Sequence, residues 1–142
     1  MVMSPDQGGV FEVLCGLTKR CLGGRIGSGK QYLSWVHDTD FCRAIDFLIA
    51  DDSIDGAVNI ASPNPLTQAD FQQQLRSALD VKLGLPATKW MAEIGAVFMK
   101  TDTELVLKSR RVIPGRLMNC GFEFKFPQWS RAVTDLVSRH SS

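Results

Sequence analysis

Histidines and paired cysteines are scarce in this sequence, and their scarcity argues against a metal site. The 142 residues include two histidines and four cysteines, and no two cysteines form a CxxC pair. Because a structural zinc site needs four nitrogen or sulfur ligands at fixed spacings, the sequence predicts no metal. Reduced thiols in a cytoplasmic protein are the simplest interpretation of the cysteines, and disulfide bonds are the alternative. The four are Cys15, Cys21, Cys42 and Cys120.

An excess of charge of either sign is also missing. Sixteen basic residues face fifteen acidic ones, for a formal net charge of +1. Nucleic-acid binders usually carry a basic surplus, so we expect no nucleic-acid partner. The apolar runs fall short of the roughly 18 residues that cross a membrane. The first nine residues lack the charged-then-apolar pattern of a signal peptide, so we expect a cytoplasmic protein without membrane contact.

The motifs of a nicotinamide enzyme are absent as well. A dinucleotide fingerprint places glycines directly after a strand, whereas the glycine-rich run of residues 23–30 follows a predicted helix. Residues 24–30, GRIGSGK, match GxxxxGK, but Gln31 stands where a phosphate loop has Ser or Thr. A flexible loop facing a substrate and a plain turn are the two remaining interpretations. The only tyrosine, Tyr32, has Val36 four residues later, so no Tyr-x-x-x-Lys pair exists.

What is present is the pattern of one mixed domain with a real core. A chain of this length suits a single domain, and 44% of its residues are hydrophobic. Helical periodicity with capping residues predicts helices, and short apolar runs bounded by turn residues predict strands. The expected helices cover residues 10–21, 38–50 with Asp38 or Thr39 as the cap, 67–79, 88–100, 104–110, 114–121 and 127–139. The expected strands cover residues 32–36, 57–60 and 122–126, and 81–86 are a further candidate.

Two clusters have an ordinary structural interpretation beside a functional one. His37 and Asp38 adjoin at a strand-to-helix junction, where they suit acid–base chemistry or a substrate contact. The ordinary alternative is a buried histidine bonded to backbone, with Asp38 capping the helix. Trp90, Met91 and Phe98 recur at helical spacing, which is typical of a core and also of a substrate cleft.

Arginines gather around one proline near the C-terminal end. Arg110, Arg111 and Arg116 lie on either side of Pro114. Guanidinium groups bind phosphates and carboxylates through paired hydrogen bonds, so the cluster is a candidate anion site. A solvated face with local ion pairs is the alternative.

Three ordered blocks of sequence resemble one enzyme family. Residues 27–40, GSGKQYLSWVHDTD, resemble the "GSG…Q…SWIH..DD" segment of epimerase-like extended short-chain dehydrogenase/reductases. Residues 56–67, GAVNIASPNPLT, resemble the "G.vN..aPnPvT" strand and loop that follow in that family. Residues 111–127, RVIPGRLMNCGFEFKFP, resemble the "RV.P..L...GF.F.yP" signature of its C-terminal domain of unknown function. Residues 4–9, SPDQGG, look like the "SP.GG" loop that follows its cofactor-binding half.

The resemblance implies that this chain corresponds to the C-terminal half of such an enzyme. Full members bind NAD or NADP in an N-terminal Rossmann half that also holds the catalytic Ser/Thr, Tyr and Lys. The implied fold is α/β, an incomplete Rossmann-type half with two or three short strands and five or six helices. Within one lobe, 1–142, residues 1–66 would complete the edge of the Rossmann half and 67–142 would form a mostly helical domain. We therefore expect no cofactor and no catalytic residue in this chain.

The first hypothesis is a substrate-binding lobe of an NAD(P)-dependent sugar-nucleotide epimerase or reductase-like protein, inactive alone. Its partners would be a small, sugar-related or anionic substrate, the Rossmann half of the same protein and a second copy in a homodimer. Where related nucleotide-sugar epimerases have an arginine four residues before the histidine, this sequence has Leu33. The candidate substrate-binding residues are Gly29, Gln31 for a hydroxyl, Trp35 for stacking on a ring, and Arg111 and Arg116 for an anion.

A stand-alone binding or interaction module without redox chemistry is the second hypothesis. An apolar patch on the face that would meet the Rossmann half would then drive dimerisation. The helix that starts at Val10 and the strand Ala57–Ile60 are the segments expected to carry that patch.

Overall fold

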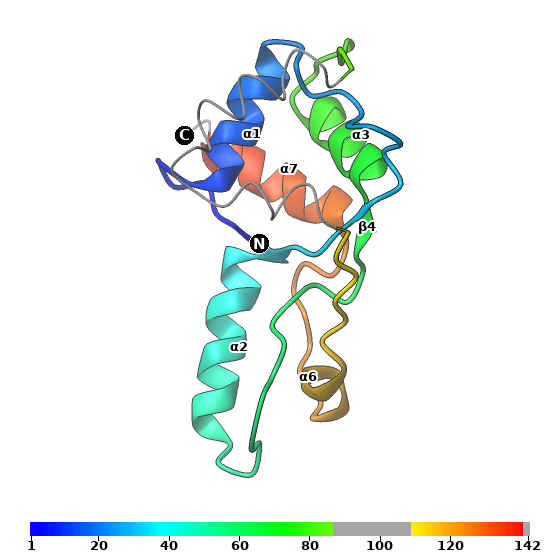
Figure 1. Cartoon of the computed structure of the whole chain (residues 1–142). Coiled ribbons are helices and arrows are strands. Elements are labelled where there is room, and N and C mark those ends of the chain that lie inside the picture. Colours follow the sequence, from blue (N-terminus) through cyan, green and yellow to red (C-terminus); the bar gives the residue numbers. More distant parts are fainter. Residues whose placement is uncertain (87–108, 141–142) are drawn as a thin grey trace.

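The computed structural model describes residues 1–86 and 109–140, and these form a mixed α/β arrangement of five helices and four very short strands (Figure 1). The strands pair in twos: β1 lies parallel to β3, and β2 lies antiparallel to β4. The strands are β1 (Val2–Met3), β2 (Tyr32–Leu33), β3 (Val36–His37) and β4 (Leu66–Thr67). The helices are α1 (Val10–Lys19), α2 (Asp38–Ala50), α3 (Gln68–Ala78), α6 (Gly115–Asn119) and α7 (Trp129–His140).

The main core lies among α1, α3 and α7, above the strands in Figure 1. Trp129 joins these parts: its ring stacks on Phe71 at 4.1 Å, and its indole N–H donates to the Phe71 carbonyl at 3.1 Å. Leu14 of α1 is only 6% exposed, so the apolar stripe of that helix is used inside this chain. The buried members are Met3, Phe11, Leu14, Cys15, Leu33, Trp35, Phe71, Leu75, Trp129, Ala132, Val133 and Leu136.

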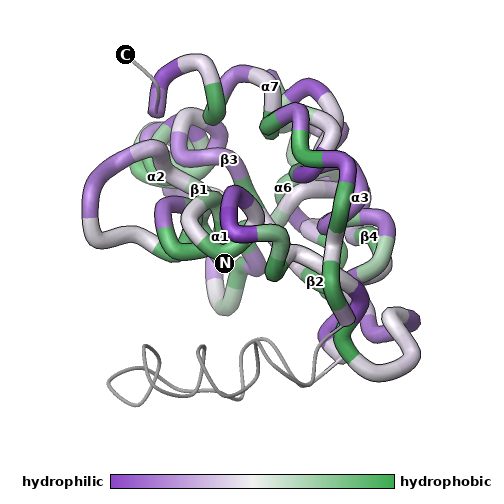
Figure 2. Tube along the Cα trace, turned by 90° about the horizontal axis from the view of Figure 1, so that it is seen from above, coloured by the Kyte–Doolittle hydropathy of each residue, from purple (hydrophilic) through white to green (hydrophobic). Residues whose placement is uncertain are grey.

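A second cluster lies beside α2, which extends away from the main core with two long segments along its flank (Figure 1). Ala44, Leu117 and Phe122 are its buried members. The outer side of α2 keeps apolar residues exposed, with Ile49 73% and Ile45 37% accessible. Figure 2 shows apolar segments facing one another between the helices and polar segments on the outer bends. Among the described residues no helix is both long and apolar enough to cross a membrane.

Several expectations from periodicity are confirmed. Helices α1, α3, α6 and α7 lie within one or two residues of their predicted starts. Thr67 caps α3 as expected: its hydroxyl oxygen accepts the Asp70 N–H at 3.2 Å and donates to the Asp70 carboxylate at 2.7 Å. Gly121, with φ +86°, follows the short helix α6 where the sequence predicted its end.

The cap of α2 was predicted wrongly. His37 is the N-cap, and its Nδ1 accepts the Thr39 N–H at 3.2 Å. Asp38 is the first helical residue, although its Oδ1 also accepts the Thr39 N–H, at 2.8 Å. Residues with short oxygen-bearing side chains are preferred at the N-cap, so the sequence favoured Asp38 or Thr39. The imidazole of His37 takes this position because tertiary contacts hold it in place.

Three predicted strands differ in the structure. The strand expected over 32–36 is divided into β2 and β3, because Ser34 and Trp35 leave the ladder between them. Residues 57–60 form no strand, since Val58 and Ile60 instead pack on the second cluster beside α2. Residues 81–86, the further candidate, also form none.

The predicted strand 122–126 is an irregular segment that side chains of α2 hold in place. Asp40 is completely buried and accepts the Lys125 N–H at 2.8 Å and the Phe126 N–H at 2.7 Å. Arg43 donates to the Glu123 carbonyl at 2.9 Å. These side chains satisfy backbone groups that a neighbouring strand would otherwise pair, so alternation of apolar residues misled the prediction. The helix predicted over 88–100 and most of that over 104–110 lie outside the described residues, and the two described residues of the latter, Ser109 and Arg110, are not helical.

Candidate functional site

A short strap, residues 109–112, lies along β2 and forms one wall of the candidate site. The Tyr32 N–H donates to the Ser109 hydroxyl at 3.1 Å, and the Arg110 N–H donates to the Tyr32 carbonyl at 3.0 Å. The Ser34 hydroxyl donates to the Arg110 carbonyl at 2.6 Å and accepts the Val112 N–H at 2.9 Å. Four hydrogen bonds therefore hold the strap, three through its backbone groups and one through the Ser109 hydroxyl, and they set the direction in which Arg110 leaves the chain.

A pocket of about 220 Å³ opens between the strap, β2 and the segment 59–61. Its apolar side is formed by aliphatic side chains, among them Leu33, Ile60 and Val112. Its polar side chains come from Tyr32, Ser34, Asn59 and Arg110, and among the described residues Arg110 is the only charged side chain in the lining. The described residues that line it are Met1, Tyr32, Leu33, Ser34, Asn59, Ile60, Ala61, Arg110 and Val112.

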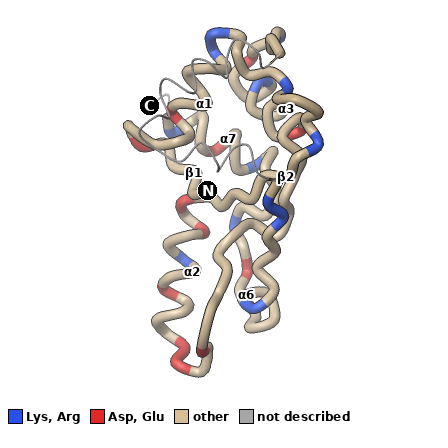
Figure 3. Tube along the Cα trace, in the orientation of Figure 1, with Lys and Arg blue, Asp and Glu red and all other residues tan. Residues whose placement is uncertain are grey.

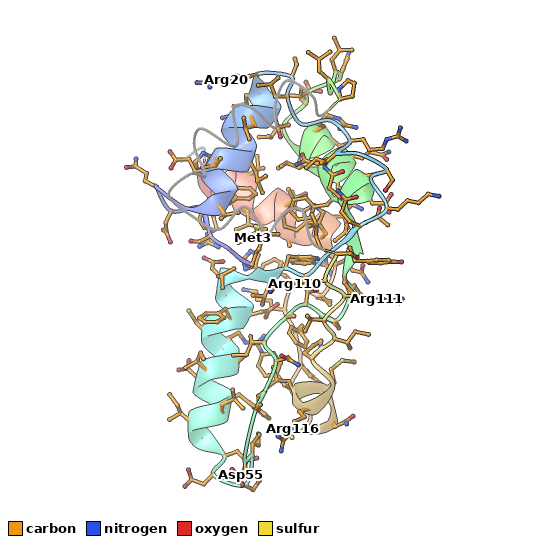
Figure 4. The ribbon with its side chains drawn as sticks, viewed as in Figure 1. Met3, Arg20, Asp55, Arg110, Arg111 and Arg116 are labelled. Carbon is orange, nitrogen blue, oxygen red and sulfur yellow. The ribbon has the colours of Figure 1, made fainter. Side chains whose placement is uncertain are left out.

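The two neighbouring arginines of the strap have different surroundings. Arg110 lines the pocket, whereas the Arg111 guanidinium lies 5.0 Å from the centre of the Tyr32 ring. In an extended segment successive side chains point to opposite sides, which accounts for the difference. Figure 4 shows both arginines at the level of the strap, and Figure 3 shows acidic residues spaced along α2 instead.

Arg116 is separate from the other two arginines. It lies on α6, towards the lower end of the molecule in Figure 4, and Asp55 lies below it. Its guanidinium donates to the Ala57 carbonyl at 3.2 Å, so it ties α6 to the segment that follows α2. The sequence cluster around Pro114 is therefore divided in space, and only Arg110 of the three lines the pocket.

Gly29 and Gln31 share a turn that is packed against the start of α3. Gly29 has φ +68°, its N–H donates to the Ile26 carbonyl at 2.9 Å, and its carbonyl accepts the Ala69 N–H at 3.1 Å. The Gln31 side chain donates to the Ile26 carbonyl at 3.2 Å. The backbone carbonyl of Gln31 accepts the Gln68 N–H at 2.8 Å. The glycine run thus closes a turn on a helix by internal hydrogen bonds.

The rest of the glycine run is packed as closely. A methyl group added at Gly24 would lie 2.0 Å from the Leu85 carbonyl oxygen, so there is no room for a side chain. The Gln68 side chain donates to the Gly24 carbonyl at 3.2 Å and accepts the Ile26 N–H at 2.9 Å. The glycine run follows α1 and precedes β2, and its backbone groups form hydrogen bonds with residues of α3. It therefore does not fit the pyrophosphate of a dinucleotide or the phosphates of a nucleotide.

Trp35 lies in the main core and is 0% exposed. Its ring meets Trp129 edge-on at 5.0 Å, and its indole N–H donates to the Asn64 carbonyl at 3.3 Å. These contacts join the segment between β2 and β3 to the proline-rich loop before β4. Trp35 is therefore one layer behind Leu33 and Ser34, which line the pocket.

His37 is buried in a cluster of charged side chains that joins α2 to α7. Its Nε2 lies 3.1 Å from the Asp135 carboxylate and its Nδ1 lies 2.8 Å from the Asp38 carboxylate. Arg139 binds both acids, at 2.6 Å from Asp38 Oδ2 and 3.2 Å from Asp135 Oδ2. The ring also stacks on Phe126 at 4.0 Å. The prediction that His37 is buried is confirmed, but the Asp135 carboxylate is a hydrogen-bond partner in addition to the backbone.

Burial sets the protonation state of this cluster. Burial lowers the pKa of His37, although Asp38 and Asp135 oppose that effect by favouring the charged ring. Burial alone would raise the pKa of Asp38, but hydrogen bonds from Arg139 and from the Thr39 N–H hold it below its ordinary value. The clearest role of the cluster is to fix α7 against the start of α2.

Sequence reasoning missed the residues that line the pocket. Tyr32 and Asn59 were not singled out, and Arg110 was counted in the arginine cluster but not among the residues expected to face a ligand. The alternation of side chains beside β2 was the available signal, because it separates Arg110 from Arg111. Among residues 1–86 and 109–140, no three His, Cys, Asp or Glu side chains are grouped so that they could hold a metal ion.

Comparisons with known proteins agree with this architecture. A domain of unknown function, DUF1731, matches residues 87–136. An epimerase family protein of Staphylococcus epidermidis is 33% identical over 134 residues, covering 93% of this chain and 43% of that protein. The crystal structure of the human epimerase family protein SDR39U1 (isoform 2) with NADPH matches 96% of this chain and 45% of that one, with a TM-score of 0.83 and 27% identity.

A second solved structure supports the fold alone. The nucleoside-diphosphate sugar epimerase of Corynebacterium glutamicum matches 98% of this chain and 24% of that one, with a TM-score of 0.67 and 22% identity. The chain spans less than half the length of the curated relatives that it matches. The resemblance seen in the sequence blocks is therefore confirmed: over nearly its whole length, this chain matches the C-terminal part of epimerase family proteins, and its residues 87–136 match DUF1731.

Proposed function

We propose that this chain is the substrate-binding lobe of an NADP(H)-dependent, sugar-nucleotide-epimerase-related protein. The main support for this proposal is a structural match: 96% of the chain matches a relative whose structure contains NADPH, at a TM-score of 0.83. The pocket beside the strap supplies a place for the substrate, because apolar walls with a few convergent polar groups are typical of small-molecule sites.

In this proposal the predicted site residues have two kinds of role. Arg111 stacks on Tyr32 and thereby positions a residue of the pocket wall. Gly29 and Gln31 fix the turn that leads into β2. Trp35 fixes the segment between β2 and β3 against the loop before β4. Arg116 anchors the segment whose continuation, Asn59–Ala61, forms the opposite wall.

The cofactor belongs to the remainder of the protein in this proposal. When bound, NADPH supplies a hydride for a carbonyl carbon, and the protein supplies position and a proton. The glycine run of this chain is committed to α3 and does not fit a dinucleotide, so we assign it no step. We also place the protein in the cytoplasm. Free thiols at all four cysteines of the chain support this location, because disulfides are rare there.

The test is to tag the gene after the codon for Ser142 and to purify the product from its own cells. Such a tag retains whatever precedes this chain. We expect the purified protein to enhance NADPH fluorescence on binding and to oxidise NADPH with members of a carbonyl panel. The 142-residue chain, expressed alone, is the matched control and should do neither. A tagged protein that binds no NADPH would overturn the proposal and would favour an interaction module.

A further inference from the structure

The pocket beside the strap has a one-sided charge that restricts what it can hold. Arg110 is the single charged side chain among its nine lining residues, and none of the nine is acidic. Within the described residues Arg110 forms no ion pair, whereas Arg43 and Arg139 are each paired with aspartates. A guanidinium that lines a partly apolar pocket and has no carboxylate partner there favours the binding of an anion.

The position of Arg110 is set by the backbone and does not depend on a ligand. Its N–H and its carbonyl are both engaged, with the Tyr32 carbonyl at 3.0 Å and the Ser34 hydroxyl at 2.6 Å. The strap therefore holds the base of this side chain on the pocket side. A preorganised arginine loses less freedom on binding, and its planar fork suits the paired oxygens of a carboxylate or phosphate.

The other polar groups of the pocket limit the number of anionic groups. The Ser34 hydroxyl already donates to the Arg110 carbonyl and accepts from Val112. Asn59 and Tyr32 thus remain as neutral side-chain partners. The Met1 amino group also lines the pocket, but it donates to the Ser34 carbonyl at 2.9 Å and would be an uncharged peptide N–H in the longer protein proposed above. Leu33, Ile60 and Val112 offer only apolar contact. One anionic group and an adjoining carbon skeleton therefore match the lining, while a diphosphate would leave a charge unpaired against aliphatic side chains.

The size of the pocket agrees with a compact group. Its volume of about 220 Å³ is below the roughly 300–1,000 Å³ of pockets that enclose drug-sized ligands. The part of the site that this chain forms therefore accommodates one end of a substrate.

We propose that this pocket selects carbonyl substrates that carry a single terminal carboxylate or phosphate monoester, which Arg110 binds, with apolar carbons against Leu33, Ile60 and Val112. This inference rests on the proposed function, since it names the substrate class of the same site. Carboxylate and phosphate share the chemistry that the guanidinium recognises, and the experiment separates them.

The experiment uses the protein tagged after Ser142 and purified from its own cells, with Arg110→Gln introduced at the locus. Three small aldehydes serve as probes: 4-oxobutanoate with a carboxylate, glyceraldehyde 3-phosphate with a phosphate, and butanal with neither. Binding of the two anions is also measured by ligand-detected NMR without cofactor. Arg131→Gln is the matched control, because it makes the same change at an exposed arginine of α7 outside the pocket.

We expect one anionic probe to bind and to be reduced, and butanal to react far more weakly. Losing a charge-assisted contact should weaken binding of that probe by about 10- to 100-fold in Arg110→Gln. Arg131→Gln should bind it as the unmodified protein does. The preferred probe, carboxylate or phosphate, identifies the source of the anion.

Equal use of butanal, or anion binding that is unchanged in Arg110→Gln, would overturn the inference. NADPH binding by Arg110→Gln shows that the variant is folded, so a loss of anion binding cannot be attributed to unfolding. If the tagged protein binds no NADPH but still binds an anion through Arg110, the proposed function is wrong and the pocket assignment stands.

Discussion

Removing the carboxylate of Asp40 tests how α2 holds the irregular segment 122–126. Asp40 has no exposed surface, and it accepts the backbone N–H groups of Lys125 and Phe126 as well as a contact from Arg43 at 3.0 Å. In Asp40→Ala both N–H groups would lose their acceptor in a place that water does not reach. The arginine would lose its buried partner at the same time.

The expected cost follows from these contacts. Hydrogen bonds to a charged group contribute about 1.5–3 kcal/mol each, whereas the ion pair with Arg43 adds little, because that side chain is 44% exposed. Because the contacts share one carboxylate, they do not add fully, and we expect Asp40→Ala to destabilise the segment by about 3–5 kcal/mol. Asp40→Asn keeps one acceptor oxygen but turns an NH₂ group towards a backbone donor, so we expect about 2–4 kcal/mol.

Hydrogen exchange read by mass spectrometry measures this loss locally. Amide exchange in the peptide that contains Lys125 and Phe126 should become about 100-fold faster or more in Asp40→Ala, since each 1.4 kcal/mol corresponds to tenfold. Asp46→Asn, at an exposed position of the same helix, is the control and should change stability by less than about 0.5 kcal/mol. A change below about threefold in Asp40→Ala would refute the anchoring role of this carboxylate.

Three further predictions address the histidine cluster and the glycines. Because burial lowers the pKa of His37 below 6.5, the unfolded chain binds its proton first as the pH falls. The contribution of His37 to the free energy of unfolding should therefore be full above pH 6.5 and decrease as the pH drops towards the lowered pKa. In His37→Gln, measured by denaturation, the free energy of unfolding should depend less steeply on pH. An equal dependence in both proteins would exclude His37 as the source. Gly24→Ala should lower the denaturation midpoint strongly, because the new methyl group would meet the Leu85 carbonyl oxygen at 2.0 Å. Gly16→Ala, in the middle of α1 with open space around it, should instead raise stability by about 0.5–1 kcal/mol, and a loss there would contradict the helix assignment.

Local patterns were sufficient for the helices and for the family resemblance. The stripe of α1 and the Thr67 cap of α3 depend on residues within a few positions of one another, so periodicity and capping rules reach them. The strands were harder, because whether 57–60 or 122–126 joins a ladder depends on partners far along the chain. Buried Asp40, 85 and 86 residues away from the amides that it binds, shows how a side chain can replace a strand.

The candidate site was reached only in part for the same reason. Composition indicated an arginine cluster, but only the strap, fixed by Ser34 and Tyr32, decides that Arg110 faces the pocket and Arg111 does not. Trp35 was expected to face a ligand because aromatic rings commonly stack on sugars. Nothing in its local sequence indicated that Trp129, 94 residues later, would cover it.

The most direct test of the account is the intact mass of the protein that carries a tag after Ser142, captured from its own cells. The account predicts a polypeptide about twice as long as this chain, as expected for two domains, with upstream peptides that include a glycine fingerprint and a Tyr-x-x-x-Lys pair. A captured protein of 15.7 kDa plus the tag would contradict it. The chain would then act without a cofactor-binding half, and the pocket beside the strap would be a binding site only.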